Sequence, residues 1–316
     1  MTDPFNRDPA AEYGRAVRLA PQVRRVTAPN PSPMTFTGTQ SYLVGEGEVV
    51  VVDPGPADPA QTRAILESLD RGERVAAILV THSHVDHSPG AALLKTETGA
   101  PVFAFGPHGA GMSAEMAALA ASGAEFGGGE GGDHAFCPDE TMRDGDTVEF
   151  GGARLVALHT PGHLSNHLAF ALEGEGGGVF TGDLVMGWAT TLVSPPEGDM
   201  AAFMASLARM AARGDAVFWP GHGHAVEDPV GMIAHQAAHR RGREAQIVAA
   251  LASAGEATPA ALTTEIYADV DPRLHGAAAR NVFAHLLGLV SEGRAEAEGA
   301  LSPSARFRLT GRPGAA

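Results

Sequence analysis

The sequence predicts a layered α/β fold over about the first 230 residues, followed by a smaller helical domain. Short apolar runs that suit buried strands lead into polar loops and then into segments with helical spacing, and this order recurs up to about residue 220. Beyond about residue 230 the apolar residues follow helical spacing over long stretches. We therefore expect one domain over residues 1–230 and a second over residues 231–316.

Two apolar runs that glycines separate stand out in the first part of the chain. They flank Gly45 and Gly47, which is typical of neighbouring strands. Ile65 and Leu69 lie four residues apart, as on one face of a helix. After a polar N-terminal arm, the expected elements are strands at 40–44, 48–52 and 75–80 and helices at 59–69 and 88–98.

The middle of the chain contains an unusual segment rich in glycine and alanine. It covers about residues 109–133 and includes Gly127, Gly128 and Gly129, and we expect it to be a mobile insertion. Phe203, Leu207 and Met210 have the spacing of one helix face. The expected elements after the insertion are strands at 147–150, 154–159, 167–172, 178–181 and 216–219 and a helix at 199–213.

The last 80 residues have the element order of a winged helix. Helices are expected at 230–253, 259–268 and 276–291, and a small hairpin at 293–297 and 305–309. Residues 235–316 contain nine arginines against eight aspartates and glutamates, so no strong basic stripe is present. We therefore expect this domain to serve in packing or in a homodimer contact, and we do not expect it to bind DNA.

The composition excludes several classes of protein. A net charge of −15 disfavours nonspecific binding to nucleic acid or to an anionic membrane. The single cysteine, Cys137, excludes an intrachain disulfide. The N-terminal residues lack the apolar run of a secretory signal, and no apolar stretch approaches the roughly 20 residues that span a membrane. The expected location is the cytoplasm.

A dense group of metal-binding side chains follows the strand expected at 75–80. His82 and His84 lie two residues apart, so in an extended segment both point the same way and can bind one metal ion. Asp86 and His87 follow directly and can face a second ion. Imidazole nitrogen and carboxylate oxygen are suitable ligands for Zn²⁺, at roughly 2.0–2.2 Å.

Three more polar residues of this kind follow expected strands. They are His163, Asp183 and His222, and each is directly preceded by a glycine that allows a tight turn and a close approach of the backbone. Asp53 lies in an earlier turn, and a simple turn residue is one interpretation of it. The histidines that flank the insertion, His108 and His134, are expected to be surface residues.

These residues, in this order, resemble the metallo-β-lactamase superfamily over about residues 20–230. The resemblance implies an αββα sandwich with two metal ions at one edge of its sheets. It implies that His82, His84 and His163 hold one zinc, that Asp86, His87 and His222 hold the other, and that Asp183 bridges them. It also implies that Asp53 supports the metal-binding loop without binding metal. The same ligand set is compatible with iron or manganese.

Further segments resemble the glyoxalase II-like subgroup that includes the β-lactamase-like endoribonuclease of mitochondria, whose members also end in a winged-helix-like domain. The segments are Thr37-Gly38-Thr39-Gln40-Ser41-Tyr42-Leu43, His159-Thr160-Pro161-Gly162-His163, Ser165-Asn166-His167, Met186-Gly187-Trp188 and Ser194-Pro195-Pro196. The insertion at 109–133 is longer than in this pattern, so the resemblance does not transfer a substrate.

The function expected from two metals is hydrolysis by a metal-bound hydroxide, because two ions roughly 3.5–4 Å apart share a water and lower its pKa toward about 7. We expect Asp86 to orient or shuttle the proton and His167 to hydrogen-bond substrate or a ligand. The expected substrate is a small ester, thioester or lactone. A single-stranded RNA endonuclease with the same metal site is the first alternative, with RNA as the substrate, and a non-catalytic metal-binding module is the second.

Overall fold

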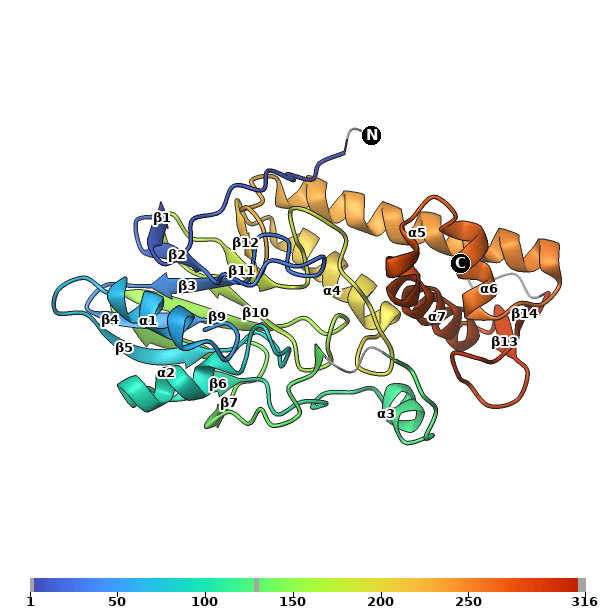
Figure 1. Cartoon of the computed structure of the whole chain (residues 1–316), viewed down its shortest axis with the longest axis horizontal. Helices are drawn as coiled ribbons and strands as arrows, with labels where there is room; N and C mark the ends of the chain where they lie inside the picture. Colours follow the sequence, from blue (N-terminus) through green and yellow to red (C-terminus); the bar gives the residue numbers. More distant parts are fainter. Residues whose placement is uncertain (1–2, 128–130, 312–316) are drawn as a thin grey trace.

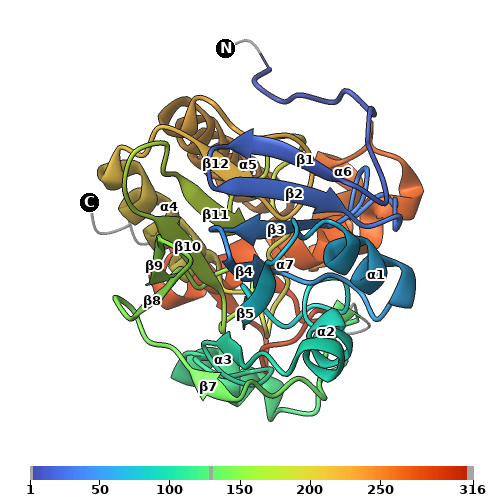
Figure 2. The same ribbon diagram turned by 90° about the vertical axis from the view of Figure 1, so that its left-hand side faces the viewer.

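The computed structural model describes residues 3–127 and 131–311. Its larger part consists of two β-sheets packed face to face with helices on both outer faces, which is the expected αββα sandwich (Figures 1 and 2). Two helices, α1 (Pro59–Glu67) and α2 (Gly90–Thr98), cover the first sheet. The helix α4 (Met200–Arg213) covers the second sheet through Phe203, Leu207 and Met210.

The first sheet has seven strands in chain order. They are β1 (Ala16–Ala20), β2 (Val23–Thr27), β3 (Gln40–Val44), β4 (Glu48–Val52), β5 (Arg74–Leu79), β6 (Val102–Ala104) and β7 (Glu140–Thr141). The strands β1 to β4 pair antiparallel, whereas β4 to β7 pair parallel. Both crossovers from β4 to β5 and from β5 to β6 contain a helix, as parallel neighbours require.

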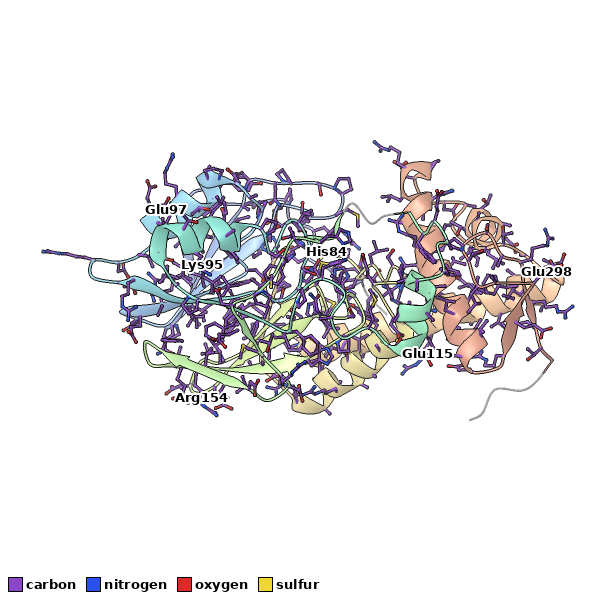
Figure 3. The ribbon with its side chains drawn as sticks, turned by 90° about the horizontal axis from the view of Figure 1, so that it is seen from below. His84, Lys95, Glu97, Glu115, Arg154 and Glu298 are labelled. Carbon is purple, nitrogen blue, oxygen red and sulfur yellow. The ribbon has the colours of Figure 1, made fainter. Side chains whose placement is uncertain are left out.

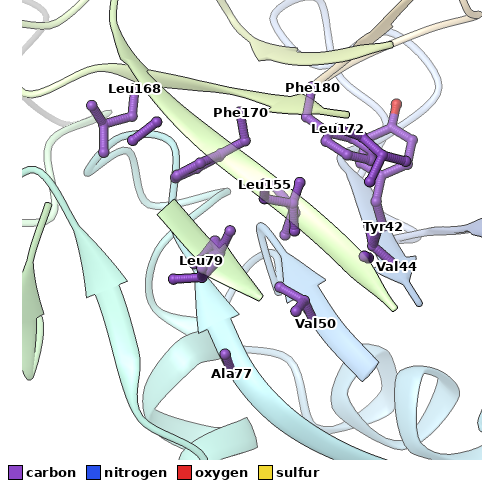
Figure 4. Packing of buried hydrophobic residues seen from close by; sticks show 14 of the residues in the cluster. Tyr42, Val44, Val50, Ala77, Leu79, Leu155, Leu168, Phe170, Leu172 and Phe180 are labelled. Atoms are coloured by element: carbon purple, nitrogen blue, oxygen red, sulfur yellow. The ribbon is translucent and has the colours of Figure 1, made fainter. Parts of the chain in front are cut away.

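The second sheet has five strands in the order β12-β11-β10-β9-β8. They are β8 (Thr147–Phe150), β9 (Ala153–His159), β10 (Leu168–Leu172), β11 (Val179–Gly182) and β12 (Phe218–Pro220). Only β11 and β12 pair parallel. Buried side chains from both sheets, among them Val50, Leu79, Leu155 and Phe170, fill the space between them (Figure 4). The Tyr42 hydroxyl donates to the carbonyl of Pro220 at 2.6 Å and so joins the two sheets.

The C-terminal part has the expected three helices and hairpin. The helices are α5 (Pro229–Ala254), α6 (Pro259–Ile266) and α7 (His275–Ser291), and the hairpin consists of the antiparallel strands β13 (Ala295–Ala297) and β14 (Phe307–Leu309). A short 3-10 turn, η2 (Pro272–Leu274), lies between α6 and α7. The long helix α5 runs from the sandwich into this part (Figure 1). Its Met232 and Ile233 pack in the core under α4, whereas Ile247 and Leu251 pack in the C-terminal core. The boundary at residue 230 stays a prediction.

The glycine-rich segment contains a helix that the sequence analysis did not predict. The helix α3 (Ala114–Ala120) is capped by Ser113, and its Met116 and Leu119 pack in the same apolar core as Phe283 of α7. The segment therefore joins the sandwich to the C-terminal helices over this stretch. Gly128 and Gly129 lie outside the described residues. In the described part of the chain, no helix is both long and apolar enough to cross a membrane.

Candidate metal centre

The seven side chains singled out in the sequence meet at one edge of the sandwich. His82, His84, Asp86 and His87 follow β5 of the first sheet, and the other three follow strands of the second sheet. Those three are His163 after β9, Asp183 after β11 and His222 after β12. His84 lies near the middle of the molecule, where the sandwich faces the C-terminal helices (Figure 3). The edge thus gathers ligand atoms from both sheets.

The first group of ligand atoms consists of His82, His84, His163 and Asp183. The Nδ1 atom of His84 lies 3.1 Å from the Nε2 atom of His82 and 3.1 Å from that of His163. The Nε2 atom of His163 lies 3.6 Å from the Oδ2 atom of Asp183. Ligands about 2.1 Å from a tetrahedral zinc ion lie about 3.4 Å from one another. The spacing therefore fits an ion at the centre of this group.

The second group consists of Asp86, His87 and His222. The Nε2 atoms of the two histidines lie 3.2 Å apart. The Oδ2 atom of Asp86 lies 3.4 Å from Nε2 of His87 and 3.2 Å from Nε2 of His222. These three atoms form one face of a second tetrahedron of the same size, so the group fits a second ion.

Asp183 belongs to the first group and also reaches the second. Its Oδ2 atom faces His163, whereas its Oδ1 atom lies 3.5 Å from Nε2 of His87 and 3.4 Å from Nε2 of His222. This Oδ1 atom is buried and has no hydrogen-bond partner among the described residues. An unpaired buried carboxylate oxygen is costly, and a cation between it and the imidazoles removes that cost. The donor set therefore fits two bound metal ions.

Asp53 holds the metal-binding loop through contacts with Thr81 and His87. Its Oδ1 atom accepts the backbone N–H of Thr81 at 2.7 Å, and its Oδ2 atom accepts the Thr81 hydroxyl at 2.7 Å. The same Oδ2 atom lies 2.9 Å from Nδ1 of His87, and the Thr81 hydroxyl lies 2.9 Å from Nδ1 of His82. When Nδ1 donates in this way, the Nε2 lone pair of each ring is left for the metal. Thr81 was not singled out in the sequence.

The other two ring-orienting contacts come from backbone carbonyls. The Nδ1 atom of His163 lies 2.8 Å from the carbonyl oxygen of Leu192, and that of His222 lies 3.2 Å from the carbonyl oxygen of Gly38. Both contacts come from segments far away in the sequence. A carbonyl oxygen can only accept, so each Nδ1 carries the proton and each Nε2 faces the ligand group.

His167 is fully buried beside the ligand groups. Its Nδ1 atom lies 2.9 Å from the Thr160 hydroxyl, and its Nε2 atom accepts the backbone N–H of Asp183 at 3.2 Å. Both ring nitrogens are therefore engaged within the protein. The structure places His167 behind the candidate ligand Asp183, where it holds the backbone of that residue, and we treat it as a positioning residue.

The electrostatics of the site favour a cation. Burial opposes protonation of His87, but the carboxylates of Asp86 and Asp183 overcome it and raise the pKa of His87 to about 9. Burial likewise opposes protonation of His222, and Asp183 nevertheless raises its pKa well above the usual range. The pKa of His84 is lowered to about 3, chiefly by burial. The second group thus attracts positive charge, and the first presents neutral imidazoles.

At two of the glycines that precede the candidate ligands, any larger residue would collide with its neighbours. A Cβ atom at Gly221 would lie 2.5 Å from Oδ1 of Asp183 and 2.6 Å from Cε1 of His87. A Cβ atom at Gly182 would lie 2.7 Å from Nε2 of His167, and this glycine also has a φ of +47°. The expected close approach of the backbone is therefore present at both positions.

Residues 34–222 match the metallo-β-lactamase superfamily, and residues 258–303 match the β-lactamase-associated winged helix domain. The chain belongs to the metallo-β-lactamase superfamily. The buried groups of histidine and aspartate are typical of the two-metal site of this superfamily. The chain is therefore a metallo-β-lactamase-fold hydrolase with a C-terminal winged helix domain, which confirms the prediction of an enzyme. The glyoxalase II-like subgroup stays a prediction.

Known proteins similar to this superfamily member include both named enzymes and solved structures. An atrochrysone carboxyl ACP thioesterase from Passalora fulva is 30% identical over 262 residues, which cover 80% of this chain and 69% of that protein. A β-lactamase-like protein 2 homolog from Drosophila melanogaster is 29% identical and covers 88% of this chain and 90% of its own length. The crystal structure of a metallo-β-lactamase family protein from Thermus thermophilus is 26% identical, has a TM-score of 0.71 and covers 92% of this chain and 99% of its own.

Proposed function

We propose that this protein is a thioesterase that hydrolyses an acyl thioester at a two-metal centre. The observation that carries the proposal is the Asp183 carboxylate, whose two oxygens face two separate groups of ligand atoms. The choice of a thioester is supported by the similarity to the Passalora thioesterase over most of both chains. An ester or lactone would need the same chemistry.

The proposed ligands fall into the two groups of side chains described above. His82, His84 and His163 would hold one ion, Asp86, His87 and His222 would hold the other, and Asp183 would bind both. We propose zinc for both ions, because imidazole nitrogen and carboxylate oxygen suit it. Bound divalent ions supply Lewis acidity and lower the pKa of water toward about 7.

Asp86 is proposed to accept and pass on a proton. Its side chain is 22% exposed, whereas the other carboxylate of the centre, Asp183, is 9% exposed. Burial disfavours the charged form of Asp86, but the neighbouring His87 and His222 outweigh this and hold its pKa below the usual range. The carboxylate is therefore charged at neutral pH, and the Thr39 hydroxyl orients it through a 3.2 Å hydrogen bond.

A mostly apolar cavity of about 340 Å³ is proposed to hold the acyl group. Its walls come from α3, from residues 195–201 and from α7. The wall residue Asp199 donates its backbone N–H to the carbonyl of Gly162, the residue before the proposed ligand His163. The size suits a small-molecule group, since binding pockets of this kind measure about 300–1,000 Å³.

The test combines metal analysis with a substrate panel. The purified protein is analysed for bound metal and then assayed with acyl thioesters, simple esters, lactones, phosphodiesters and single-stranded RNA. We expect at least two metal ions per chain and turnover of thioesters that Asp183→Asn abolishes. A metal-loaded protein that cleaves RNA and leaves every thioester intact would contradict the proposal.

A further inference from the structure

Three potential metal ligands gather outside the centre described above. They are His108, His134 and Glu197, and one ligand atom of each lies within 4.8 Å of the others. They come from three separate segments: the loop after β6, the end of the glycine-rich segment, and the loop before α4. The group shares no residue with the two groups at the sheet edge. The superfamily's two-metal centre does not account for it.

His108 is held in place as a metal ligand would be. Its side chain is 8% exposed, and its Nδ1 atom lies 2.9 Å from the hydroxyl of Ser83. The Asn166 amide donates to the same hydroxyl at 2.9 Å and fixes its position. On the other side of the ring, Nε2 lies 2.8 Å from Oε1 of Glu197. Ligating histidines in proteins commonly donate the N–H of their second ring nitrogen to an oxygen atom of the protein, and the Ser83 hydroxyl is placed to accept it from Nδ1 of His108.

Gly132 leaves open the space into which the two imidazoles point. A Cβ atom at this position would lie 3.0 Å from Nε2 of His108 and 3.3 Å from Nε2 of His134. The Cε1 atom of His108 would be even closer, at 2.7 Å, so both imidazole rings border the space that the missing side chain of Gly132 leaves open. The two rings also lie edge to face, with centroids 4.3 Å apart. Two imidazole nitrogens and a nearby carboxylate oxygen thus converge on one small space.

We propose that His108, His134 and Glu197 bind a third divalent metal ion of the zinc class. Two histidines and one glutamate form one of the three-ligand sets that proteins use for zinc, and they leave a fourth position open for water or another ligand. The ion would join the end of the glycine-rich segment to the loop before α4. The Ser83 hydroxyl, which contacts His108, lies between His82 and His84 in the chain. The ion would therefore couple that junction to the loop of the two-metal centre.

The stoichiometry of zinc binding tests the proposal without reference to activity. The full-length protein is stripped with a chelator and titrated with Zn²⁺ by calorimetry, and the saturated samples are checked by elemental analysis. We expect three equivalents per chain for the unmodified protein and two for His134→Ala. His134 is exposed, so this variant is expected to fold. The matched control is His275→Ala, which removes a partly exposed histidine from α7 and is expected to bind three equivalents.

A second variant keeps all three ligand residues. Gly132→Ala puts a methyl group 2.7 Å from Cε1 of His108 and 3.3 Å from Nε2 of His134, so the rings must move apart and we expect it also to bind two equivalents. Substitution with Co²⁺ gives an independent readout, since the visible absorption of the third equivalent is expected to vanish in both variants. Saturation of the unmodified protein at two equivalents would overturn the proposal. So would a third equivalent that survives in His134→Ala.

Discussion

At the scale of single residues, Asp53 supports the metal centre from a backbone conformation that few residues other than glycine adopt. Its φ is +50°, and aspartate tolerates this region better than most residues. The conformation lets one carboxylate bind the Thr81 backbone, the Thr81 hydroxyl and the His87 ring together. Two alternatives were open for Asp53 from the sequence, and these contacts are those of a support for the metal-binding loop.

We expect Asp53→Asn to lower the metal affinity of the centre by about 10- to 100-fold, the usual effect of changing a residue that orients a ligand. The amide has one accepting atom where the carboxylate has two, so either Thr81 or His87 loses its partner. Competition with a chromophoric chelator measures the affinity. Asp58→Asn is the matched control, because it removes the same charge from the nearby N-cap of α1 and asparagine caps equally well. Equal affinities in the two variants would contradict this role.

The residues of the centre differ in how far the sequence could predict them. The run from His82 to His87 is visible because four potential ligands lie within six residues. Thr81 and Leu192 act through a hydroxyl and a backbone carbonyl, and neither group distinguishes them from many others in the chain. His108 was expected at the surface, yet its side chain is 8% exposed, because Glu197 and Ser83 approach it from distant segments. Only tertiary structure brings such partners together.

At the scale of elements, a buried ion pair joins β2 to the start of β5. The Arg24 guanidinium donates to both carboxylate oxygens of Glu73, at 2.8 and 3.0 Å, and both side chains are less than 10% exposed. Arg24 also donates to the carbonyl of Ser68 at the end of α1. The pair therefore connects a strand, a helix end and the turn that leads to the metal-binding loop.

We expect Glu73→Gln to lower the free energy of unfolding by up to roughly 3 kcal/mol at neutral pH, because Arg24 loses its buried counter-ion. It keeps only the exposed Asp70 carboxylate, 3.3 Å away. Burial raises the pKa of Glu73, but Arg24 outweighs this and holds it below the usual value. The stabilisation is thus present above the unfolded-state pKa of about 4.3 and is lost as the pH falls through the folded-state value. Urea unfolding at several pH values checks this. A difference between the two proteins that grows below pH 4 would contradict it.

The C-terminal helices contact the segment that orients His163. Asn281 of α7 accepts the backbone N–H of Val193 at 3.1 Å and also accepts from Arg240 of α5 at 3.2 Å. The Arg240 guanidinium in turn donates to the carbonyl of Thr191. Between these two anchored residues lies Leu192, whose carbonyl binds His163. The helices α5 and α7 thus hold one histidine of the candidate metal centre in place.

Loss of this contact is expected to weaken metal binding from a distance. In Asn281→Ala the Val193 N–H and Arg240 lose an acceptor, which costs about 1–3 kcal/mol of stability. We also expect the zinc affinity of the group that contains His163 to fall, as measured by chelator competition. Thr264→Ala, which removes an exposed hydroxyl from α6, is the control and should change neither quantity. An unaltered zinc affinity in Asn281→Ala would show that Leu192 needs no such anchor.

Periodicity predicted the long elements well and the short ones poorly. The strands β3 and β4 have the expected bounds, and α4, α5 and α7 lie within one or two residues of theirs. The short strands β6 and β7 have too few residues to show an alternating pattern. The helix α3 was missed because glycines surround it, and its helical conformation is stabilised by burial of Met116 and Leu119 against the C-terminal core.

At the scale of the whole molecule, the sandwich and the winged helix domain share packing at two places. The first half of α5 belongs to the core under α4, and α3 belongs to the C-terminal core. The order of the two domains could be predicted from the change in periodicity near residue 230. Their mutual packing could not, because it depends on contacts between residues far apart in the chain. The expected homodimer and cytoplasmic location stay predictions.

The cavity between α3 and α7 gives the last prediction, which rests on the proposed thioesterase activity. Gly288 lines this cavity, and a Cβ atom there would meet nothing within 4 Å. Gly288→Leu therefore starts its side chain in open space at the cavity wall, and leucine favours the helix. We expect kcat/KM for long acyl thioesters to fall at least about 10-fold relative to acetyl thioesters. Gly242→Leu, at an exposed and equally open helix position, is the control. If both variants keep the original preference for acyl length, the acyl group binds elsewhere.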